Sequence, residues 1–404
     1  MEPLIPRHAL GWASELLDTF PAVVVQGARQ VGKSTFAELL VEDRSATLVT
    51  LDDEGPRAAA AEDPAAFVNQ VPTGTLVIDE IQRAPQLILA IKAAIDRDRR
   101  PGRFVLTGSS DLLRLTRTPD SLAGRAVTVS LRTLSQGEIQ GRRGDLVSRL
   151  KAGGDVAGFI TSVTRSDYAE RIARGGYPEV QAMSERLRAT WFDSYSQRLL
   201  ERDVSDLAPR IDAARLSSVL RLLAANQTGE LVKARIARDA NVPETSVTTY
   251  IDLLEVMFLI GVLRPWTPNL TSREVARPKT YVTDPGLALR LARVAKDHLT
   301  PLGSPHLGAA MEGFVVTELL KQRTWSSEEF ELFHFRDRAG VEVDIVVEFY
   351  DGSVIGLVVK SGSTPKSQHF AGLRALRDKL GERFIGGYVL NTGERAEFFG
   401  DRLH

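Results

Sequence analysis

A glycine-rich stretch near the start of the chain has the residue types that bind a chain of phosphates. It has the sequence GARQVGKS, with two glycines separated by four residues and followed by lysine and serine. Glycines let successive backbone N–H groups turn inward around an anion, and a helix beginning here would direct its positive end toward the phosphates. Lys33 would contact the β- and γ-phosphates, and the Ser34 hydroxyl would bind Mg²⁺. The spacing predicts a phosphate-binding loop, whose expected nucleotide contacts are Gly27, Ala28, Arg29, Gln30, Val31, Gly32, Lys33, Ser34 and Thr35.

An acidic pair follows an apolar run further along the chain. Leu76 to Glu80 has the sequence LVIDE, which is typical of a buried strand that ends in two carboxylates. A bound magnesium ion needs a carboxylate at the end of the strand beside the phosphate loop, so Asp79 is predicted to bind the metal together with Ser34. Glu80 would orient and polarise the attacking water. Such a pair taken alone could be a solvated loop, but beside a phosphate loop it indicates hydrolysis.

The elements that must position these residues follow from the apolar runs in the first third of the chain. Short β-branched runs alternate there with helical stretches over 33–40 and 87–96, and the runs are Ala22 to Val25, Leu48 to Leu51, Thr75 to Ile78 and Phe104 to Leu106. Nearly continuous apolar runs are typical of strands buried on both faces of a parallel sheet. The alternation predicts a doubly wound α/β domain, and the glycine-rich KAGGDV at 151–156 is a natural junction after it.

The rest of the chain divides into a helical middle and a second α/β region. In the middle, a helix from Leu231 to Ala240, a turn and a longer helix from Thr245 to Leu259 form a helix-turn-helix pattern. The elements expected later are a helix from Leu307 to Gln322, strands near 330–336, 341–349 and 354–360, a helix over 366–380 and a strand from Phe384 to Leu390. This order predicts a C-terminal α/β domain.

Composition places the chain among ordinary globular proteins. Its 404 residues are 43% hydrophobic and 25% charged, and this length is too great for one core, which predicts several domains. The net charge of −1 excludes a global positive field that would attract nucleic acid or anionic membranes. The lack of cysteine excludes disulfides, thiol catalysis and cysteine-bound zinc. Without a signal-peptide pattern or a long apolar span, we expect a soluble cytoplasmic protein that does not associate with membranes.

Together these motifs resemble a widespread group of prokaryotic ATPases that join an AAA+ type P-loop ATPase domain to a C-terminal domain of uncharacterised function with a restriction-endonuclease-like core. The resemblance covers nearly the whole chain and rests on Gln26 to Thr35 (QGARQVGKST), Leu51 to Asp53 (LDD) before Asp63-Pro64, Leu76 to Gln82 (LVIDEIQ), Leu106 to Ser110 (LTGSS), Ser121 to Arg125 (SLAGR), Gly175 to Glu179 (GGYPE) and Glu342 to Asp344 (EVD). It implies ATP as the nucleotide. It also implies an ATPase domain over 1–160, a helical lid over 161–210, a winged-helix-like module over 211–280 and the C-terminal domain over 281–404.

The resemblance extends the site beyond the phosphate loop. In AAA+ proteins a polar residue after the LTGSS strand senses the γ-phosphate, which makes Thr107 and Ser109 candidates, with a plain serine–threonine turn as the alternative. Arg125 could stabilise charge on the transferring phosphate, in cis or from a neighbouring subunit of a homo-oligomer, or form an ordinary ion pair. Pro178 could approach the nucleotide from the lid, or mark a turn that ends a helix. The predicted catalytic residues are Glu80, Lys33, Arg125, Thr107 and Ser109.

The charges of the helix-turn-helix argue against DNA binding. No lysine or arginine lies between Arg238 and Arg264, whereas the same segment contains Asp239, Glu244, Asp252 and Glu255. Phosphate contacts supply most of the affinity for DNA, so we expect DNA binding to be weak or absent. The module is predicted to serve in packing or partner contact, with an ATP-responsive DNA-binding regulator as the alternative.

The C-terminal domain has only part of the metal site that restriction-endonuclease-like enzymes use. The resemblance places Glu312 on a helix and Asp344 on a strand. Lys360 follows on the next strand, but Val358 stands where that site needs a glutamate. The loss of an oxygen ligand weakens Mg²⁺ binding and water activation. Strand alternation puts two further carboxylates on the face of Asp344, and either could substitute: Glu342 and Glu348.

The sequence therefore predicts an ATP-dependent molecular switch. ATP and Mg²⁺ would bind to the first domain, and hydrolysis would be coupled to the C-terminal half, which would recognise an unknown protein or nucleic-acid partner. We expect the restriction-endonuclease-like core to be degenerate. The alternatives left open are an ATP-gated DNA-binding protein, a metal-dependent nuclease and an ATP-locked scaffold with negligible turnover.

Overall fold

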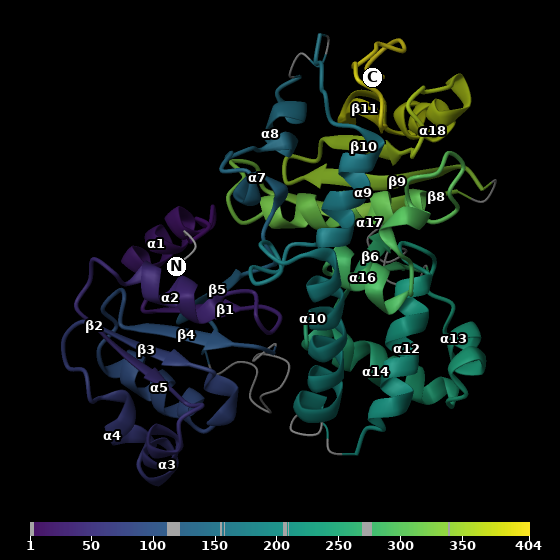
Figure 1. Ribbon diagram of the computed structural model, residues 1–404. Coiled ribbons are helices and arrows are strands. Elements are labelled where there is room, and N and C mark those ends of the chain that lie inside the picture. Colours follow the sequence, from purple (N-terminus) through teal and green to yellow (C-terminus); the bar gives the residue numbers. More distant parts are fainter. Residues whose placement is uncertain are drawn as a thin grey trace. The chain divides into compact units, whose positions relative to one another are not determined.

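The computed structural model describes residues 4–110, 122–153, 156, 158–204, 208, 210–268, 277–337 and 340–404 (Figure 1). The chain forms two compact units, Met1–Arg143 with Leu253–Leu259, and Gly144–Asp252 with Ile260–His404. Among the described residues, no helix combines the length and the apolar character needed to cross a bilayer.

The first unit is built on a parallel sheet in the strand order β2-β3-β4-β1-β5. The strands are β1 (Ala22–Gln26), β2 (Ala46–Thr50), β3 (Thr75–Asp79), β4 (Phe104–Gly108) and β5 (Ala126–Ser130). Every pairing in this sheet is parallel, and β1 and β4 are buried along their whole length. Because the strands are parallel, their carboxyl ends lie at one edge, and the strand order makes β4 the neighbour of both β1 and β3 there.

Strand β2 differs from the expectation for its apolar run. The sequence predicts a strand buried on both faces, but no residue of β2 is fully buried, and Leu48 is 49% exposed. The reason is its place at the edge of the sheet, where β3 is its neighbour and no strand of the described residues lies beyond it. Hydrophobicity reports that a segment is a strand but does not report its position in the sheet.

Helices cover both faces of this sheet (Figure 1). The helical elements of the unit are α1 (Leu10–Thr19), α2 (Lys33–Leu40), α3 (Glu54–Glu62), α4 (Pro64–Val68), the 3₁₀ turn Ile81–Arg83, α5 (Leu87–Arg97) and α7 (Gln136–Ile139). Alternate strand residues share one core with α5, namely Ala22, Val24, Leu76, Ile78, Phe104 and Leu106 with Ile88, Ile91 and Ile95. Helices α1 and α2 pack against β1, and α2 also packs against β4. The prediction of a parallel α/β domain is thus confirmed.

The second unit contains a mixed sheet in the order β11-β10-β9-β8-β6-β7. Its strands are β6 (Ile260–Pro265), β7 (Lys279–Val282), β8 (Phe330–Arg336), β9 (Glu342–Phe349), β10 (Val354–Val359) and β11 (Phe384–Leu390). Strand β6 and the start of β7 lie within the module predicted over 211–280, but β6 pairs with β8 through Arg264↔Phe333. The β6–β7 hairpin is therefore continuous with the C-terminal sheet.

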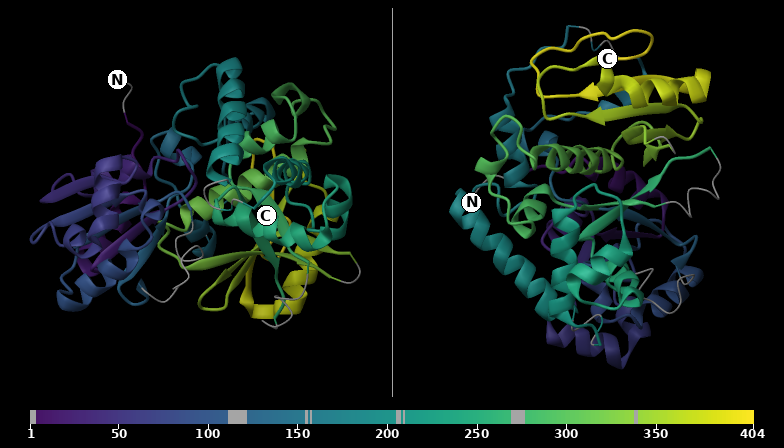
Figure 2. Two further views of the ribbon diagram at one scale, coloured as in Figure 1. Left: turned by 90° about the horizontal axis from the view of Figure 1, so that it is seen from below. Right: turned by 90° about the vertical axis from the view of Figure 1, so that its right-hand side faces the viewer.

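Helices α17 (Leu307–Gln322) and α18 (Ala371–Leu380) cover opposite faces of this sheet (Figure 2). Successive residues of β9 point to opposite faces of the sheet. Ile345 packs in the core that contains α17, and Val346 packs in the core that contains α18. The other helical elements after residue 143 are α8 (Leu146–Lys151), α9 (Arg165–Arg174), α10 (Glu185–Arg198), the π-helical turn Leu199–Asp203, α12 (Ala213–Ala225), α13 (Lys233–Ala240), α14 (Glu244–Val256), α16 (Pro285–Leu291) and the 3₁₀ turns Lys296–His298, Ser367–Phe370 and Gly381–Arg383.

The boundary of the first unit falls at residue 143 instead of 160. Helix α8 explains the difference, because Val147 and Leu150 are buried in the core that contains α17. Helix α9, from the segment predicted to be a lid, shares that core through Ala169 and Ile172. A glycine-rich segment marks a loop, but the core into which the preceding helix packs decides the boundary.

A buried aspartate fastens the GGYPE segment inside the second unit. Gly175 has φ +70°, and a Cβ there would lie 2.4 Å from Oδ1 of Asp284. The Gly176 N–H donates to Asp284 Oδ2 at 2.7 Å, and Asp284 Oδ1 also accepts from the Leu287 N–H at 3.0 Å at the start of α16. One fully buried carboxylate thus holds a turn and a helix start together.

Replacing this carboxylate should destabilise the second unit strongly. We expect Asp284→Ala to lower its free energy of unfolding by about 3 kcal/mol, because buried N–H groups that lose their acceptor cost about 1–3 kcal/mol each. Asp212→Ala is the matched control, since Asp212 caps α12 through the Ala214 N–H at 2.9 Å but is exposed. Its expected cost is about 1 kcal/mol. Urea unfolding of both variants measures the difference, and equal losses would contradict the assignment.

Candidate nucleotide site

The phosphate loop leaves the carboxyl end of β1 between two neighbouring strands. Gln26 lies opposite Gly108 of β4, and the Gly27 N–H donates to the Gly108 carbonyl at 3.3 Å. On the other side, the Leu131 N–H donates to the Gln26 carbonyl at 2.8 Å. A Cβ at Gly27 would lie 2.0 Å from the Leu131 carbonyl oxygen, so close backbone packing also requires this glycine.

The loop has the backbone of an anion-binding nest. Gln30 and Gly32 have φ +61° and +90°, and α2 begins immediately afterwards at Lys33. Left-handed residues among right-handed ones turn successive N–H groups toward a common point, beside the positive end of the helix. Lys33 is only 5% exposed, and its Nζ donates to the Ala28 carbonyl at 3.0 Å. The lysine ammonium therefore lies against the loop itself.

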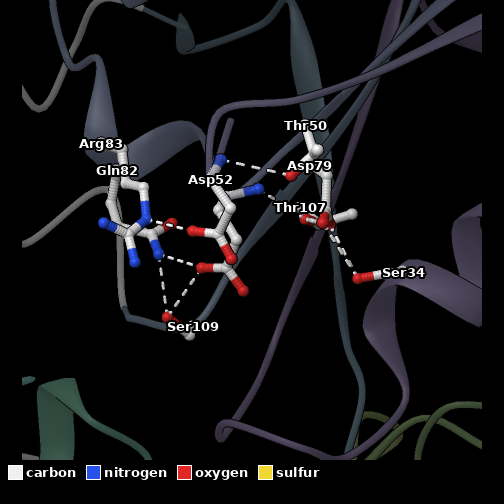
Figure 3. Close-up of polar contacts among 9 residues, drawn as sticks. Ser34, Thr50, Asp52, Asp79, Gln82, Arg83, Thr107 and Ser109 are labelled. Atoms are coloured by element: carbon white, nitrogen blue, oxygen red, sulfur yellow. Dashed lines mark hydrogen bonds and ion pairs between the residues drawn. The ribbon is translucent and has the colours of Figure 1, made fainter. Parts of the chain in front are cut away.

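Ser34 and Asp79 come together at the edge where β3 ends (Figure 3). The Ser34 hydroxyl lies 3.0 Å from Oδ1 and 3.1 Å from Oδ2 of Asp79. Thr107 completes the junction, because its hydroxyl donates to Asp79 Oδ1 and accepts from the Glu80 N–H at 3.0 Å. The hydroxyl of β4 thus fixes both acidic residues, at the carboxylate and at the backbone.

Two neighbouring polar side chains, Gln82 and Ser109 (Figure 3), hold the Glu80 carboxylate. Ser109 Oγ donates to Glu80 Oε2 at 3.0 Å, and Gln82 Nε2 donates to the same oxygen and to Ser109 Oγ at 2.8 Å. Glu80 has φ +56°, which turns the chain away from the strand direction immediately after Asp79. Gln82 is part of the LVIDEIQ block, but the sequence alone did not identify it as a partner of Glu80.

A second group of polar side chains lies beside this network. Arg83 forms an ion pair with Asp52, whose backbone N–H donates to Thr50 Oγ1 at 3.2 Å (Figure 3). Asp52 comes from the segment after β2, so this pair joins the loop after β3 to the neighbouring strand. The LDD block noted in the sequence points to Asp52, but nothing in the sequence indicates its partner.

Two of the predicted site residues have other partners. Arg125 binds Asp96 through Nε–Oδ1 at 2.6 Å and Nη2–Oδ2 at 3.0 Å, which is the ion pair that the sequence left open as the alternative. This pairing raises the pKa of Arg125 and lowers the pKa of Asp96. The SLAGR block begins at residue 121, which lies outside the described residues. Pro178 belongs to the turn fastened by Asp284 in the second unit, and its approach to a nucleotide stays a prediction.

The side chains at the junction fit a magnesium ion. Mg²⁺ prefers hard oxygen ligands and retains several waters and phosphate oxygens, so a protein commonly supplies one or two of its ligands. The Ser34 hydroxyl and the Asp79 carboxylate are of this kind and lie within 3.1 Å of each other. Their metal-binding role stays a prediction, and the donor set is the one that a nucleotide-bound magnesium needs.

The carboxylates predicted for a nuclease site lie beside a lysine in the second unit. Lys279 of β7 is 5% exposed and binds Glu312 Oε1 at 2.9 Å and Glu342 Oε1 at 2.6 Å. Asp344 Oδ2 accepts from the Val359 N–H at 2.7 Å and lies 3.8 Å from Lys360 Nζ. One ammonium group thus forms ion pairs with two of the carboxylates. Glu348 instead pairs with Arg383 at 3.3 Å.

The basic side chains of the helix-turn-helix also have partners. Lys233 donates to Thr248 Oγ1 at 3.0 Å, and Arg235 donates to Asn226 Oδ1 at 2.8 Å. Arg238 pairs with the adjacent Asp239 at 3.0 Å. Of these three cations, Arg238 is paired with a carboxylate, whereas Lys233 and Arg235 donate to neutral side chains.

Comparison with known proteins gives matches along most of the chain. An AAA domain matches residues 19–140, the domain of unknown function DUF8612 matches 165–298, and the domain of unknown function DUF4143 matches 307–404. The uncharacterised proteins Rv2008c of Mycobacterium tuberculosis and Mb2031c of Mycobacterium bovis are each 32% identical over 365 residues, which cover 89% of this chain and 74% of theirs.

Solved structures also show a more remote likeness to this chain. The Walker-type ATPase PABY2304 of Pyrococcus abyssi is 14% identical, with a TM-score of 0.42 over 71% of this chain and 96% of that one. AMPPCP-bound DnaA from Aquifex aeolicus is 11% identical, with a TM-score of 0.30 over 61% of this chain and 86% of that one.

Two buried groups near Lys279 have pKa values displaced in opposite directions. Burial, reinforced by Asp344 and Glu342, outweighs Lys279 and raises the pKa of Glu312 to about 7. Burial and the charge of Lys279 lower the pKa of His334 to about 4. Between about pH 4.5 and 7, Glu312 therefore keeps its proton in the folded state but loses it in the unfolded state. The contribution of Glu312 to the free energy of unfolding falls as the pH rises through this range. Between about pH 4 and 6.5, His334 is protonated in the unfolded state but not in the folded state. The contribution of His334 to the free energy of unfolding therefore rises with pH through this range.

The two contributions should nearly cancel between about pH 4.5 and 6.5. We expect Glu312→Gln to make stability rise more steeply with pH than in the wild type, and His334→Gln to make it fall, each by up to about 1.4 kcal/mol per pH unit. His306→Gln is the control, since His306 is exposed. Chemical unfolding across this pH range measures the slopes. Slopes parallel to the wild type in both variants would contradict the displaced pKa values.

Proposed function

The chain belongs to a family of AAA-type ATPases with a C-terminal domain of unknown function, and from this premise we propose that it is a Mg²⁺-dependent ATPase that acts as a molecular switch. The observation that carries the proposal is the junction of the phosphate loop with the end of β3. There the Ser34 hydroxyl lies 3.0 Å from the Asp79 carboxylate, directly after a loop with the backbone of an anion nest.

The loop and its lysine would bind the triphosphate. Backbone N–H groups around Gly32 receive the phosphate oxygens, and Lys33 exchanges its contact with the Ala28 carbonyl for one with the β- and γ-phosphates. Ser34 and Asp79 would hold Mg²⁺, which when bound neutralises charge on the phosphates. Desolvation of Lys33 strengthens its attraction for the anion, since the ammonium is nearly buried.

Glu80 would act on the attacking water. Ser109 and Gln82 both donate to Oε2, and within the described residues Oε1 accepts no hydrogen bond. We assign Oε1 as the atom that takes the proton of the water, while Oε2 keeps the carboxylate in place. Thr107 supports this arrangement by fixing the Glu80 backbone N–H relative to Asp79. Thr107 and Ser109 thus act as positioning residues for the two carboxylates.

ATP binding and hydrolysis in the first unit would change the conformation of the second unit. The γ-phosphate and Mg²⁺ order the segments around them in P-loop proteins, and hydrolysis releases those segments. We propose that the segment 161–210, with its Gly-Tyr-Pro turn, is the receiving element. The helix-turn-helix and the C-terminal sheet would then present a surface for a partner. A protein partner is favoured over DNA, because the cations of α13 already have side-chain partners.

Replacing the loop lysine should abolish tight nucleotide binding. We expect Lys33→Ala to weaken ATP binding by about 10- to 100-fold, because a charge-assisted contact to phosphate contributes about 1.5–3 kcal/mol. Lys92→Ala on α5 is the control for loss of a lysine in the same unit. Calorimetric titration with Mg·ATP measures both. Unchanged affinity in Lys33→Ala would remove the loop from its assigned role.

Replacing the proposed base should separate binding from turnover. Glu80→Gln keeps the hydrogen-bonding shape but cannot take a proton, so we expect ATP to bind with wild-type affinity and hydrolysis to slow by about 10²- to 10⁴-fold. Glu62→Gln, at the exposed end of α3, should hydrolyse ATP at the wild-type rate. Single-turnover measurement of phosphate release provides the test. Wild-type rates in Glu80→Gln would assign the base to another group.

A further inference from the structure

The segment before α1 places a buried guanidinium against the phosphate loop. Arg7 has a side chain that is 9% exposed, and Nη1 donates to the Val31 carbonyl at 2.9 Å. Nη2 donates to the carbonyl of Arg132, which follows β5, and Nε lies 3.3 Å from Glu138 Oε1. One side chain thus joins three segments that are far apart in the sequence.

The partner carboxylate is itself fixed. Glu138 is 3% exposed, and its Oε2 accepts from the backbone N–H of Ser135 at 2.7 Å in the capping box of α7. Its Oε1 also accepts from the His8 N–H at 2.9 Å. Because both oxygens have partners, Glu138 holds the guanidinium in one place. The ion pair brings two opposite charges together inside the protein. Burial lowers the pKa of Arg7, and the charge of Glu138 opposes this effect.

The contact with Val31 determines the direction of the next N–H group. The Val31 carbonyl and the Gly32 N–H belong to one planar trans peptide unit, in which the two bonds point in opposite directions. A carbonyl held by Arg7 therefore turns the Gly32 N–H away from Arg7. Gly32 has φ +90° and immediately precedes Lys33, so its N–H is one of the donors of the anion nest.

We infer that Arg7 is a positioning residue for nucleotide binding, which aims the Gly32 N–H into the phosphate cradle by holding the Val31 carbonyl. The inference rests on the proposed function of the loop. It makes the residues before α1 part of the nucleotide site without any contact to the ligand. Because Glu138 forms an ion pair with the guanidinium, the effect is geometric, and it applies equally to ATP and ADP. Arg7 variants should therefore raise KM and leave kcat nearly unchanged.

Arg103 provides a matched control. It is also a buried arginine of the first unit, and it donates to backbone carbonyls through Nη1, to Ala94 at 2.6 Å and to Asp98 at 2.9 Å. It precedes β4, at the opposite end of the parallel strands from the phosphate loop. Arg103→Met should destabilise the unit as Arg7→Met does, without moving the loop.

The test combines binding of fluorescent ADP with hydrogen exchange of the peptide that covers the loop. We expect Arg7→Met to weaken ADP binding about tenfold and to speed exchange over 27–34, with Arg7→Lys intermediate. Arg103→Met should change neither. Unchanged affinity and exchange in Arg7→Met would overturn the inference, as would equal losses in Arg103→Met.

Two further measurements keep the result decisive. If Arg7→Met does not fold, Arg7→Lys and Glu138→Gln take its place, and wild-type affinity and exchange in both would overturn the inference. If the wild-type protein does not bind ADP at all, the proposed function fails. Loop exchange then still decides whether Arg7 orders the loop, because that measurement needs no nucleotide.

Discussion

The structure of the nucleotide site depends on the meeting of three strand ends. A parallel sheet in which β1 lies beside β4, and β4 beside β3, brings the phosphate loop, an acidic pair and a polar strand end to one edge. Thr107 joins these parts, because its hydroxyl donates to Asp79 and accepts from the Glu80 N–H. Ser34 completes the junction from the phosphate loop. The chemistry proposed for this protein requires that junction, since a metal and a water can be placed only if both carboxylates are fixed relative to the loop.

Much of this arrangement could be predicted from the sequence because it is local. The phosphate loop and the acidic strand end are short patterns whose residue types follow from phosphate and metal chemistry. Contacts between distant segments are harder to predict, since several spatial arrangements fit the same sequence pattern. Gln82 as a partner of Glu80, the ion pair of Asp52 with Arg83 and the contact of Arg7 with Val31 each require knowledge of which segments are neighbours. The edge position of β2 and the first unit's end at residue 143 were missed for the same reason.

In the second unit, the positive charge of Lys279 changes how the carboxylates that resemble a nuclease metal site are interpreted. Glu312 and Asp344 stand on the helix and strand that the resemblance to restriction-endonuclease-like cores indicates. Lys279 enters from β7, a strand that the sequence assigned to another module, and binds Glu312 and Glu342. An ammonium among carboxylates offsets the charge that would otherwise attract a divalent cation. The carboxylates that resemble a nuclease site therefore belong to an ion-pair cluster with Lys279.

The central claim is that the first unit binds ATP with a metal shared between Ser34 and the tip of β3. Calorimetric titration of the wild-type protein with ATP, in magnesium and in EDTA, tests it most directly when repeated with Asp79→Asn. The account predicts one site per chain whose affinity is raised by magnesium, and loss of that magnesium effect in Asp79→Asn with residual binding retained. An absence of binding heat in the wild-type protein, or a magnesium effect that survives Asp79→Asn, would contradict it.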